Sequence, residues 1–106
     1  MSEFSNYLEA KLDELVTANR ILGNENVCDA FGHVSVRHPG RNDRYFLSRS
    51  RAPERVEVED LMEFTLDGDP VDQRGRTPYA ERFIHGAIYA RRPDVQSVVH
   101  NHSMNI

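Results

Sequence analysis

The most regular pattern of apolar positions lies near the N-terminus. Between residues 3 and 23 apolar side chains recur every three or four positions, which places them on one face of a helix. These residues are Leu8, Leu12, Leu15, Val16 and Leu22, and most charged residues of the segment fall on the other faces. Gly23 and Asn24 supply a C-terminal stop. The pattern predicts an amphipathic helix over residues 3–23.

A hairpin is predicted after this helix. Residues 30–37 alternate between apolar and polar in their second half, and the strand is expected to begin at Gly32. The segment 39–43 contains proline, glycine, asparagine and aspartate, which favour a turn. Residues 44–47 form the second predicted strand, which pairs with the first.

The middle of the chain predicts short elements. Residues 58–61 indicate a helical turn, and residues 62–66 a strand that ends at the tight-turn pair Asp67-Gly68. Pro70-Val71 is expected to return as an edge strand, because proline lacks the N–H that a central strand must donate.

The last third of the chain predicts a helix followed by a strand. Residues 78–91 have helical spacing, with Phe83, Ile84, Ala87 and Ile88 on one side, and Pro93 follows the helix. Residues 95–100 predict a strongly apolar strand. The order of elements indicates an α/β fold with helices packed on a sheet. A strand this apolar needs cover on both faces; we therefore expect residues 1–106 to be the N-terminal portion of a larger single domain.

Composition narrows the function classes. The chain has 106 residues, of which 39% are hydrophobic and 28% charged, as in an ordinary globular domain. Its net charge of −4 argues against nucleic-acid binding. The N-terminus lacks the pattern of a signal peptide, and no apolar run is long enough for a membrane span. Cys28 is the single cysteine, so no internal disulfide is possible. These observations favour a cytoplasmic protein.

Two histidines close the predicted final strand. His100 and His102 are two residues apart, and in an extended strand such side chains project from the same face. Two imidazoles in this arrangement suit a divalent metal ion, which also needs a third protein ligand. The alternative is a pair of histidines without a metal role.

Three further groups have side chains suited to chemistry. Glu81 and His85 are four apart on the predicted helix, so they share one face; they form either a carboxylate site near a metal or a simple hydrogen bond. The loop 48–51 carries two serines and two arginines, which either bind an anion or are solvated. His33 and Ser35 share a strand face and either line a pocket or pair with neighbours. Tyr89 is interpreted as helix packing.

Taken in order, these pieces resemble the class II aldolase/adducin family. The matching segments are residues 32–37, 46–50, 60–68, 81–89, 92–95 and 98–102. The combination of the Glu-x-x-x-His helix, Arg-Pro-Asp-Val and His-x-His is specific, whereas each alone is not. The resemblance runs from about residue 5 to the end, and it covers the N-terminal half of that domain.

The resemblance implies a three-layer αβα fold and a homotetramer with active sites at subunit interfaces. It also implies that His100 and His102 bind a divalent metal, zinc or manganese, with a third histidine further along the family's chain. Glu81 matches the acidic residue that serves as acid/base in such enzymes.

Two departures from the family bear on the substrate. The family's glycine–asparagine pair, which helps to hold a sugar phosphate, is Gly32-His33 here, and its glycine-containing phosphate loop is replaced by Ser48, Arg49, Ser50 and Arg51. Arginine pairs well with carboxylates through its planar fork. We therefore expect a small unphosphorylated carboxylate substrate, bound by this loop together with His33 and Ser35.

The branch with the greatest similarity comprises decarboxylases of 2-hydroxy-3-carboxymuconic semialdehyde, an intermediate of aromatic ring degradation. The resulting hypothesis is a metal-dependent carbon–carbon lyase that decarboxylates a 2-oxo or enol acid. Three alternatives remain at this point: a sugar-phosphate aldolase or epimerase of the same fold, a non-catalytic scaffold like the adducin head, and a truncated chain without activity of its own.

Overall fold

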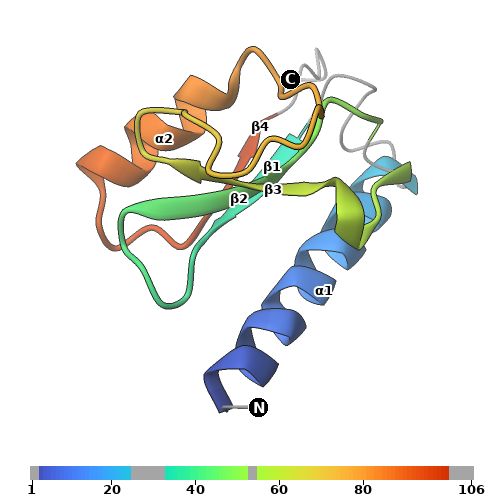
Figure 1. The fold of residues 1–106 in the computed structure, drawn as a ribbon, viewed down its shortest axis with the longest axis horizontal. Coiled ribbons are helices and arrows are strands. Elements are labelled where there is room, and N and C mark those ends of the chain that lie inside the picture. Colours follow the sequence, from blue (N-terminus) through green and yellow to red (C-terminus); the bar gives the residue numbers. More distant parts are fainter. Residues whose placement is uncertain (1–2, 25–32, 53–54, 101–106) are drawn as a thin grey trace.

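The computed structural model describes residues 3–24, 33–52 and 55–100. In this part of the chain two helices and four strands follow the order α1, β1, β2, β3, α2, β4, with a 3₁₀ turn before β3 (Figure 1). Their bounds are α1 Glu3–Asn24, β1 His33–Arg37, β2 Arg44–Ser48, the 3₁₀ turn Val58–Asp60, β3 Leu61–Thr65, α2 Arg82–Arg91 and β4 Ser97–His100. None of the described helices is both long enough and apolar enough to cross a membrane.

The four described strands form one sheet in the order β3-β2-β1-β4, and every neighbouring pair is antiparallel. The predicted hairpin is confirmed, because β1 pairs with β2 in a register that sets Val36 opposite Phe46. β4 joins the other side of β1, although it comes last in the sequence, and sets His100 opposite His33. This crossover brings the start of β1 and the end of β4 to the same end of the sheet.

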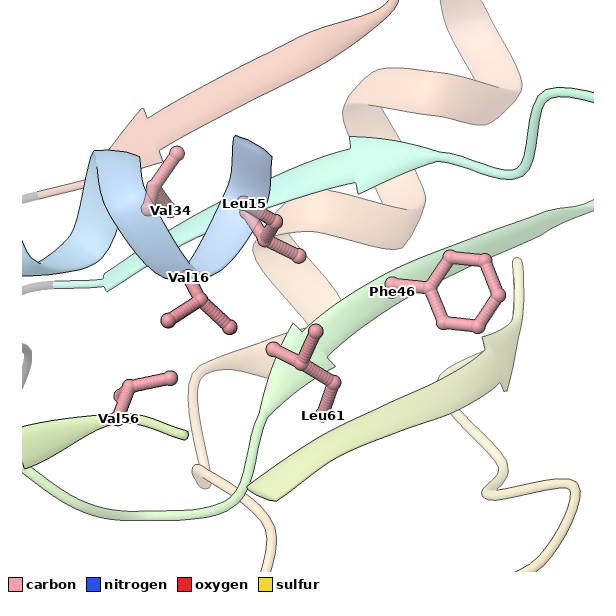
Figure 2. Close-up of a cluster of buried hydrophobic side chains, with 6 residues drawn as sticks. All are labelled: Leu15, Val16, Val34, Phe46, Val56 and Leu61. Atoms are coloured by element: carbon pink, nitrogen blue, oxygen red, sulfur yellow. The ribbon is translucent and has the colours of Figure 1, made fainter. Parts of the chain in front are cut away.

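Alternation along the strands creates two separate cores, one on each face of the sheet. Figure 2 shows the first, in which Leu15 and Val16 of α1 face side chains of the sheet and of the loop before β3. The buried members of this core are Leu15, Val16, Val34, Phe46, Val56 and Leu61. The second core, on the α2 side, consists of Tyr45, Leu47, Met62, Phe64, Tyr79 and Tyr89. The helices thus cover opposite faces, and the expected three-layer αβα arrangement is confirmed.

The turns agree with the sequence pattern. Gly68 has a φ of 89°, a conformation that glycine adopts without a steric penalty, and its N–H bonds to the Thr65 carbonyl. The predicted edge pairing of Pro70 is present as an isolated bridge to Phe64, and the Val71 N–H donates to Glu63.

Two predicted boundaries are wrong. The second helix begins at Arg82 and not at residue 78, because Pro78 forms an isolated antiparallel bridge with Arg49, the residue after β2. The last strand begins at Ser97 and not at residue 95, because the Val95 N–H closes a turn onto the Arg92 carbonyl. In both cases a tertiary or turn hydrogen bond outweighs the apolar pattern.

The close approach of α2 to the sheet depends on Gly86. A Cβ at this position would lie 2.2 Å from the backbone oxygen of Leu66, which cannot move without shifting the end of β3. We therefore expect Gly86→Ala to lower the free energy of unfolding by about 3 kcal/mol, at the upper end for overpacking. Urea denaturation measures this loss. Ala87→Ser, at the adjacent exposed helix position, is the control, with a change within about 0.5 kcal/mol; equal losses would contradict the packing argument.

Candidate active site

Glu81 and His33 meet at one end of the sheet. Glu81 is the N-cap residue of α2, and its side chain caps no helix N–H. Its Oε1 instead lies 3.6 Å from Nε2 of His33, the first residue of β1. The Glu81 side chain is 38% exposed, whereas that of His33 is fully buried. A ligand can therefore reach the Glu81 carboxyl group, whereas solvent cannot reach its partner His33.

His85 contacts the opposite side of the His33 ring. Its Nε2 lies 2.6 Å from Nδ1 of His33, and both rings are fully buried. His85 lies one helical turn after Glu81, so the two residues present the same face of the helix start. The structure shows that this face contacts His33, so Glu81 and His85 are bridged by a side chain from β1.

The contacts continue from His85 into the sheet. The Ser35 hydroxyl lies 2.5 Å from Nδ1 of His85 and 2.8 Å from the Tyr89 hydroxyl. Burial raises the pKa of Tyr89 to about 12, so its phenol keeps its proton at neutral pH. The interpretation of Tyr89 as helix packing alone is therefore incomplete, because its hydroxyl belongs to a buried polar network.

Tyr79 connects this network with the arginine-containing loop, and sequence analysis missed it. Its ring centroid lies 4.6 Å from that of His33. Its hydroxyl donates to the backbone carbonyl of Arg51 and accepts from the backbone N–H of the same residue. The loop 48–51 and the Glu81–His33 pair thus lie on either side of one aromatic residue. The predicted helix over residues 78–91 included Tyr79 in its first turn, and no local pattern indicated these contacts with His33 and Arg51.

The two arginines of the loop differ in their surroundings. Arg51 pairs with the buried carboxylate of Asp60 at 3.0 Å. Arg49 is half-buried, and its backbone N–H donates to the Asp60 carbonyl at 2.6 Å. Within the described part of the chain the Arg49 guanidinium forms no ion pair. Arg49 is therefore the arginine of this loop that is available to an anion.

The remaining predicted substrate contacts are placed as follows. The Ser48 hydroxyl is buried and donates to the Arg49 carbonyl, and Ser50 is exposed on the loop. His33 and Ser35 are buried and bond to protein groups. A role of these four residues in substrate binding stays a prediction.

The predicted metal ligands lie at the boundary of the described structure. His100 ends β4 directly opposite His33, and His102 lies outside the described residues. Among the side chains that the structure describes, no three histidine, cysteine, aspartate or glutamate residues gather as a metal-ligand set. The ligation of a metal by His100 and His102 therefore stays a prediction.

A cavity of about 510 Å³ lies on the other side of the molecule. Its walls include Leu15 of α1, Val34 and Val36 of β1, and Val99 of β4. Val34 belongs to the α1-side core, whereas the Glu81–His33 pair lies on the α2 side. The cavity therefore lies mainly on the α1 face of the sheet, although Ser35 of the polar network is also among its lining residues.

Comparison with known proteins identifies the architecture. The profile of the Class II Aldolase and Adducin N-terminal domain matches residues 13–106. This chain belongs to the class II aldolase/adducin family. The family is thus the one that the sequence motifs resemble.

Similar proteins of the class II aldolase/adducin family have several activities in their names. Decarboxylase tropJ of Talaromyces stipitatus is 44% identical over 86% of this chain and 35% of its own length. L-Fuculose phosphate aldolase of Escherichia coli is 34% identical over 70% of this chain and 33% of its own. The solved L-fuculose 1-phosphate aldolase of Glaciozyma antarctica PI12 superimposes with a TM-score of 0.86 at 28% identity, covering 98% of this chain and 44% of that one. The chain spans about a third of these curated relatives.

Proposed function

We propose that the protein is a metal-dependent carbon–carbon lyase that decarboxylates an unphosphorylated 2-oxo or enol acid. The observation that carries the proposal is the convergence of two groups at one end of the sheet. A half-exposed carboxyl group, Glu81, lies there against His33. The guanidinium of Arg49, which forms no ion pair with any described residue, belongs to the loop that Tyr79 joins to the same place. One group suits proton transfer, and the other suits a carboxylate. The similarity to a protein named a decarboxylase supports this reading.

The chain's own residues account for binding and proton transfer. Arg49 holds a carboxylate of the substrate through charge-assisted hydrogen bonds. The leaving carboxylate is the one on the carbon next to the oxo carbon, or next to the enol carbon after it has become a ketone. Its bond to that carbon breaks, CO₂ departs, and the bonding electrons stay on the substrate as an enolate. Glu81 then gives its proton to that carbon and recovers a proton through its exposed side.

A divalent cation fits this end of the sheet. His100 lies opposite His33 in the register of β1 and β4, so the predicted ligand position adjoins the Glu81–His33 pair. Imidazole nitrogen is a good donor for zinc. We propose that His100 and His102 hold the ion, and that the bound ion supplies Lewis-acid stabilisation of negative charge. From the resemblance to the class II aldolase/adducin family we also propose that the protein forms a homotetramer and lies in the cytoplasm.

The test is turnover by the metal-loaded full-length protein. We expect CO₂ release from unphosphorylated 2-oxo and enol dicarboxylic acids, loss of that activity after chelation, and recovery on adding zinc or manganese. The similarity to an L-fuculose phosphate aldolase favours sugar-phosphate cleavage as a second candidate. Cleavage of sugar phosphates, without turnover of the acids, would replace the first proposal by the second.

Arg49 provides a prediction about substrate binding. We expect Arg49→Gln to raise KM about ten- to a hundredfold, the cost of a charge-assisted hydrogen bond, with a smaller change in kcat. Steady-state kinetics measure both constants. Arg91→Gln removes the same charge from the exposed end of α2 and should leave KM unchanged. A KM for Arg49→Gln within about twofold of the wild type would exclude Arg49 as the carboxylate ligand.

A further inference from the structure

One tyrosine joins the start of α2 to the arginine-containing loop. The loop 48–51 begins at the last residue of β2 and lies far from Glu81 in the sequence. We propose that Tyr79 is a positioning residue, whose phenol fixes this loop so that the Arg49 guanidinium lies where the substrate carboxylate binds. The catalytic consequence rests on the proposed decarboxylation, whereas the attachment of the loop by Tyr79 does not.

Tyr79 is held at its backbone and along its ring. Its carbonyl accepts from the backbone N–H of Arg82 at 3.3 Å and from Nη1 of the same arginine at 3.1 Å, which attaches Tyr79 to the first residue of α2. Its ring is buried in the α2-side core and lies against that of His33, with the centroids 4.6 Å apart. Because the backbone and the ring are both held, α2 and β1 determine where the hydroxyl lies.

The Tyr79 hydroxyl contacts both backbone groups of one loop residue. It donates to the Arg51 carbonyl, and it accepts from the Arg51 N–H at 3.3 Å. The two directions are fixed, because a carbonyl oxygen can only accept and a backbone N–H can only donate. Arg49 and Ser50 are already joined to residues 77–78 by an antiparallel bridge and a backbone hydrogen bond. The phenol therefore extends the attachment of the loop to Arg51.

The backbone N–H groups of residues 49–51 are occupied by protein acceptors. Those of Arg49 and Ser50 donate to backbone carbonyls at 2.6 and 2.7 Å, and that of Arg51 donates to the Tyr79 hydroxyl. Phosphate sites commonly use several backbone N–H groups, whereas one guanidinium matches both oxygens of a carboxylate. A loop held in this way presents the Arg49 side chain to a substrate, and not a set of free amides.

The loop has a second attachment that does not involve the phenol. Nη1 of Arg51 lies 3.0 Å from the buried carboxylate of Asp60, so this ion pair holds the Arg51 side chain while Tyr79 holds its backbone. Arg49 lies two residues earlier, and its guanidinium forms no ion pair with any described residue. The orientation of Arg49 therefore depends on the loop backbone, which removal of the phenol releases without breaking the ion pair.

Amide hydrogen exchange in the metal-loaded full-length protein tests the attachment without an activity assay. Tyr79→Phe keeps a ring against His33 and removes the hydroxyl alone. We expect the Arg51 amide to exchange about tenfold faster, the effect of losing one hydrogen bond. The amides of β1, which lies between β2 and β4, should keep their rates. Unchanged exchange at Arg51 would overturn the proposal, whatever reaction the protein catalyses.

Steady-state kinetics of the same variant test the positioning role. We expect Tyr79→Phe to raise KM for the decarboxylated acid about five- to tenfold, and to leave kcat within about twofold of the wild type. A residue needed only for folding would not produce this division between the two constants. Tyr45→Phe is the control, because this buried phenol donates to the Arg82 carbonyl and not to the loop. It should leave both constants unchanged.

A double-mutant cycle tests whether Tyr79 acts through Arg49. Arg49→Gln has already lost the carboxylate contact, so adding Tyr79→Phe should change KM by less than about twofold. Independent effects that multiply in KM, or a loss confined to kcat, would contradict the proposal. Absence of turnover in the wild type would count against the proposed function, and the exchange rate of the Arg51 amide would still decide whether the phenol fixes the loop.

Discussion

Glu81→Gln should lower kcat by about 10²- to 10⁴-fold, the usual contribution of a positioned acid/base group. Glutamine keeps the shape of the side chain and a contact to His33, but it cannot give a proton to the carbon that loses CO₂. Because the Glu81 side chain makes no cap bond to α2, the fold should survive the change. Steady-state kinetics give the loss of kcat, and urea denaturation should show a stability change of about 1 kcal/mol or less, the scale of a lost helix-dipole interaction.

The control for this experiment is a carboxylate elsewhere on the sheet. Glu63 of β3 is partly exposed and pairs with Arg44 at 2.9 Å. Glu63→Gln removes the same charge and should leave kcat unchanged. If Glu81→Gln also kept wild-type kcat, the acid/base role of Glu81 would be wrong, and the carboxyl group at the start of α2 would be a structural feature.

Arg37→Met should strongly destabilise the protein. The buried guanidinium donates to four backbone carbonyls, those of Asn42, Tyr89, Arg92 and Val95. These bonds join β1 to the end of α2 and to the turn before β4. Leaving the four buried acceptors without a donor should lower the free energy of unfolding by about 3–5 kcal/mol. Chemical denaturation, or loss of soluble folded protein, measures the effect.

Two variants separate hydrogen bonding from charge. Arg37→Lys keeps the charge but has fewer donors in a different geometry, so its loss should be smaller than that of Arg37→Met. Arg44→Met removes the partly exposed ion pair with Glu63 and should cost about 1 kcal/mol or less. A loss for Arg37→Met no larger than that for Arg44→Met would show that the buried donors contribute little.

The sequence predicted the layers of this fold because each layer has a local signature. The helical spacing of α1 predicts its apolar face, and the alternation along β1 predicts that His33 and Ser35 share a face. In the structure Leu15 and Val16 of α1 are buried in one core, and His33 and Ser35 both contact His85 of α2. The start of α2 was placed too early, since the bridge between Pro78 and Arg49 joins segments about thirty residues apart. Periodicity within one segment contains no information about such a bond.

The candidate site was predictable in its residues but not in its arrangement. The four-residue spacing of Glu81 and His85 indicates a shared face, and the structure places His33 against that face. Nothing in the local sequence indicates that a strand residue would lie between them. The roles of Tyr79 and Tyr89 were missed for the same reason, because their hydroxyl partners come from other elements. Tertiary hydrogen bonds between buried polar groups decide these roles.

The most direct test of the account is the fate of one deuterium. The metal-loaded full-length protein is incubated in D₂O with a 2-oxo acid whose neighbouring carbon bears the leaving carboxylate and one hydrogen, so that decarboxylation creates a methylene group there, and the product is analysed by NMR. If Glu81 delivers the proton from one side of the substrate, the product carries a single deuterium in one configuration, and Glu81→Gln loses this product. An equal mixture of configurations from the wild type, or the same stereospecific product at the wild-type rate from Glu81→Gln, would contradict the account.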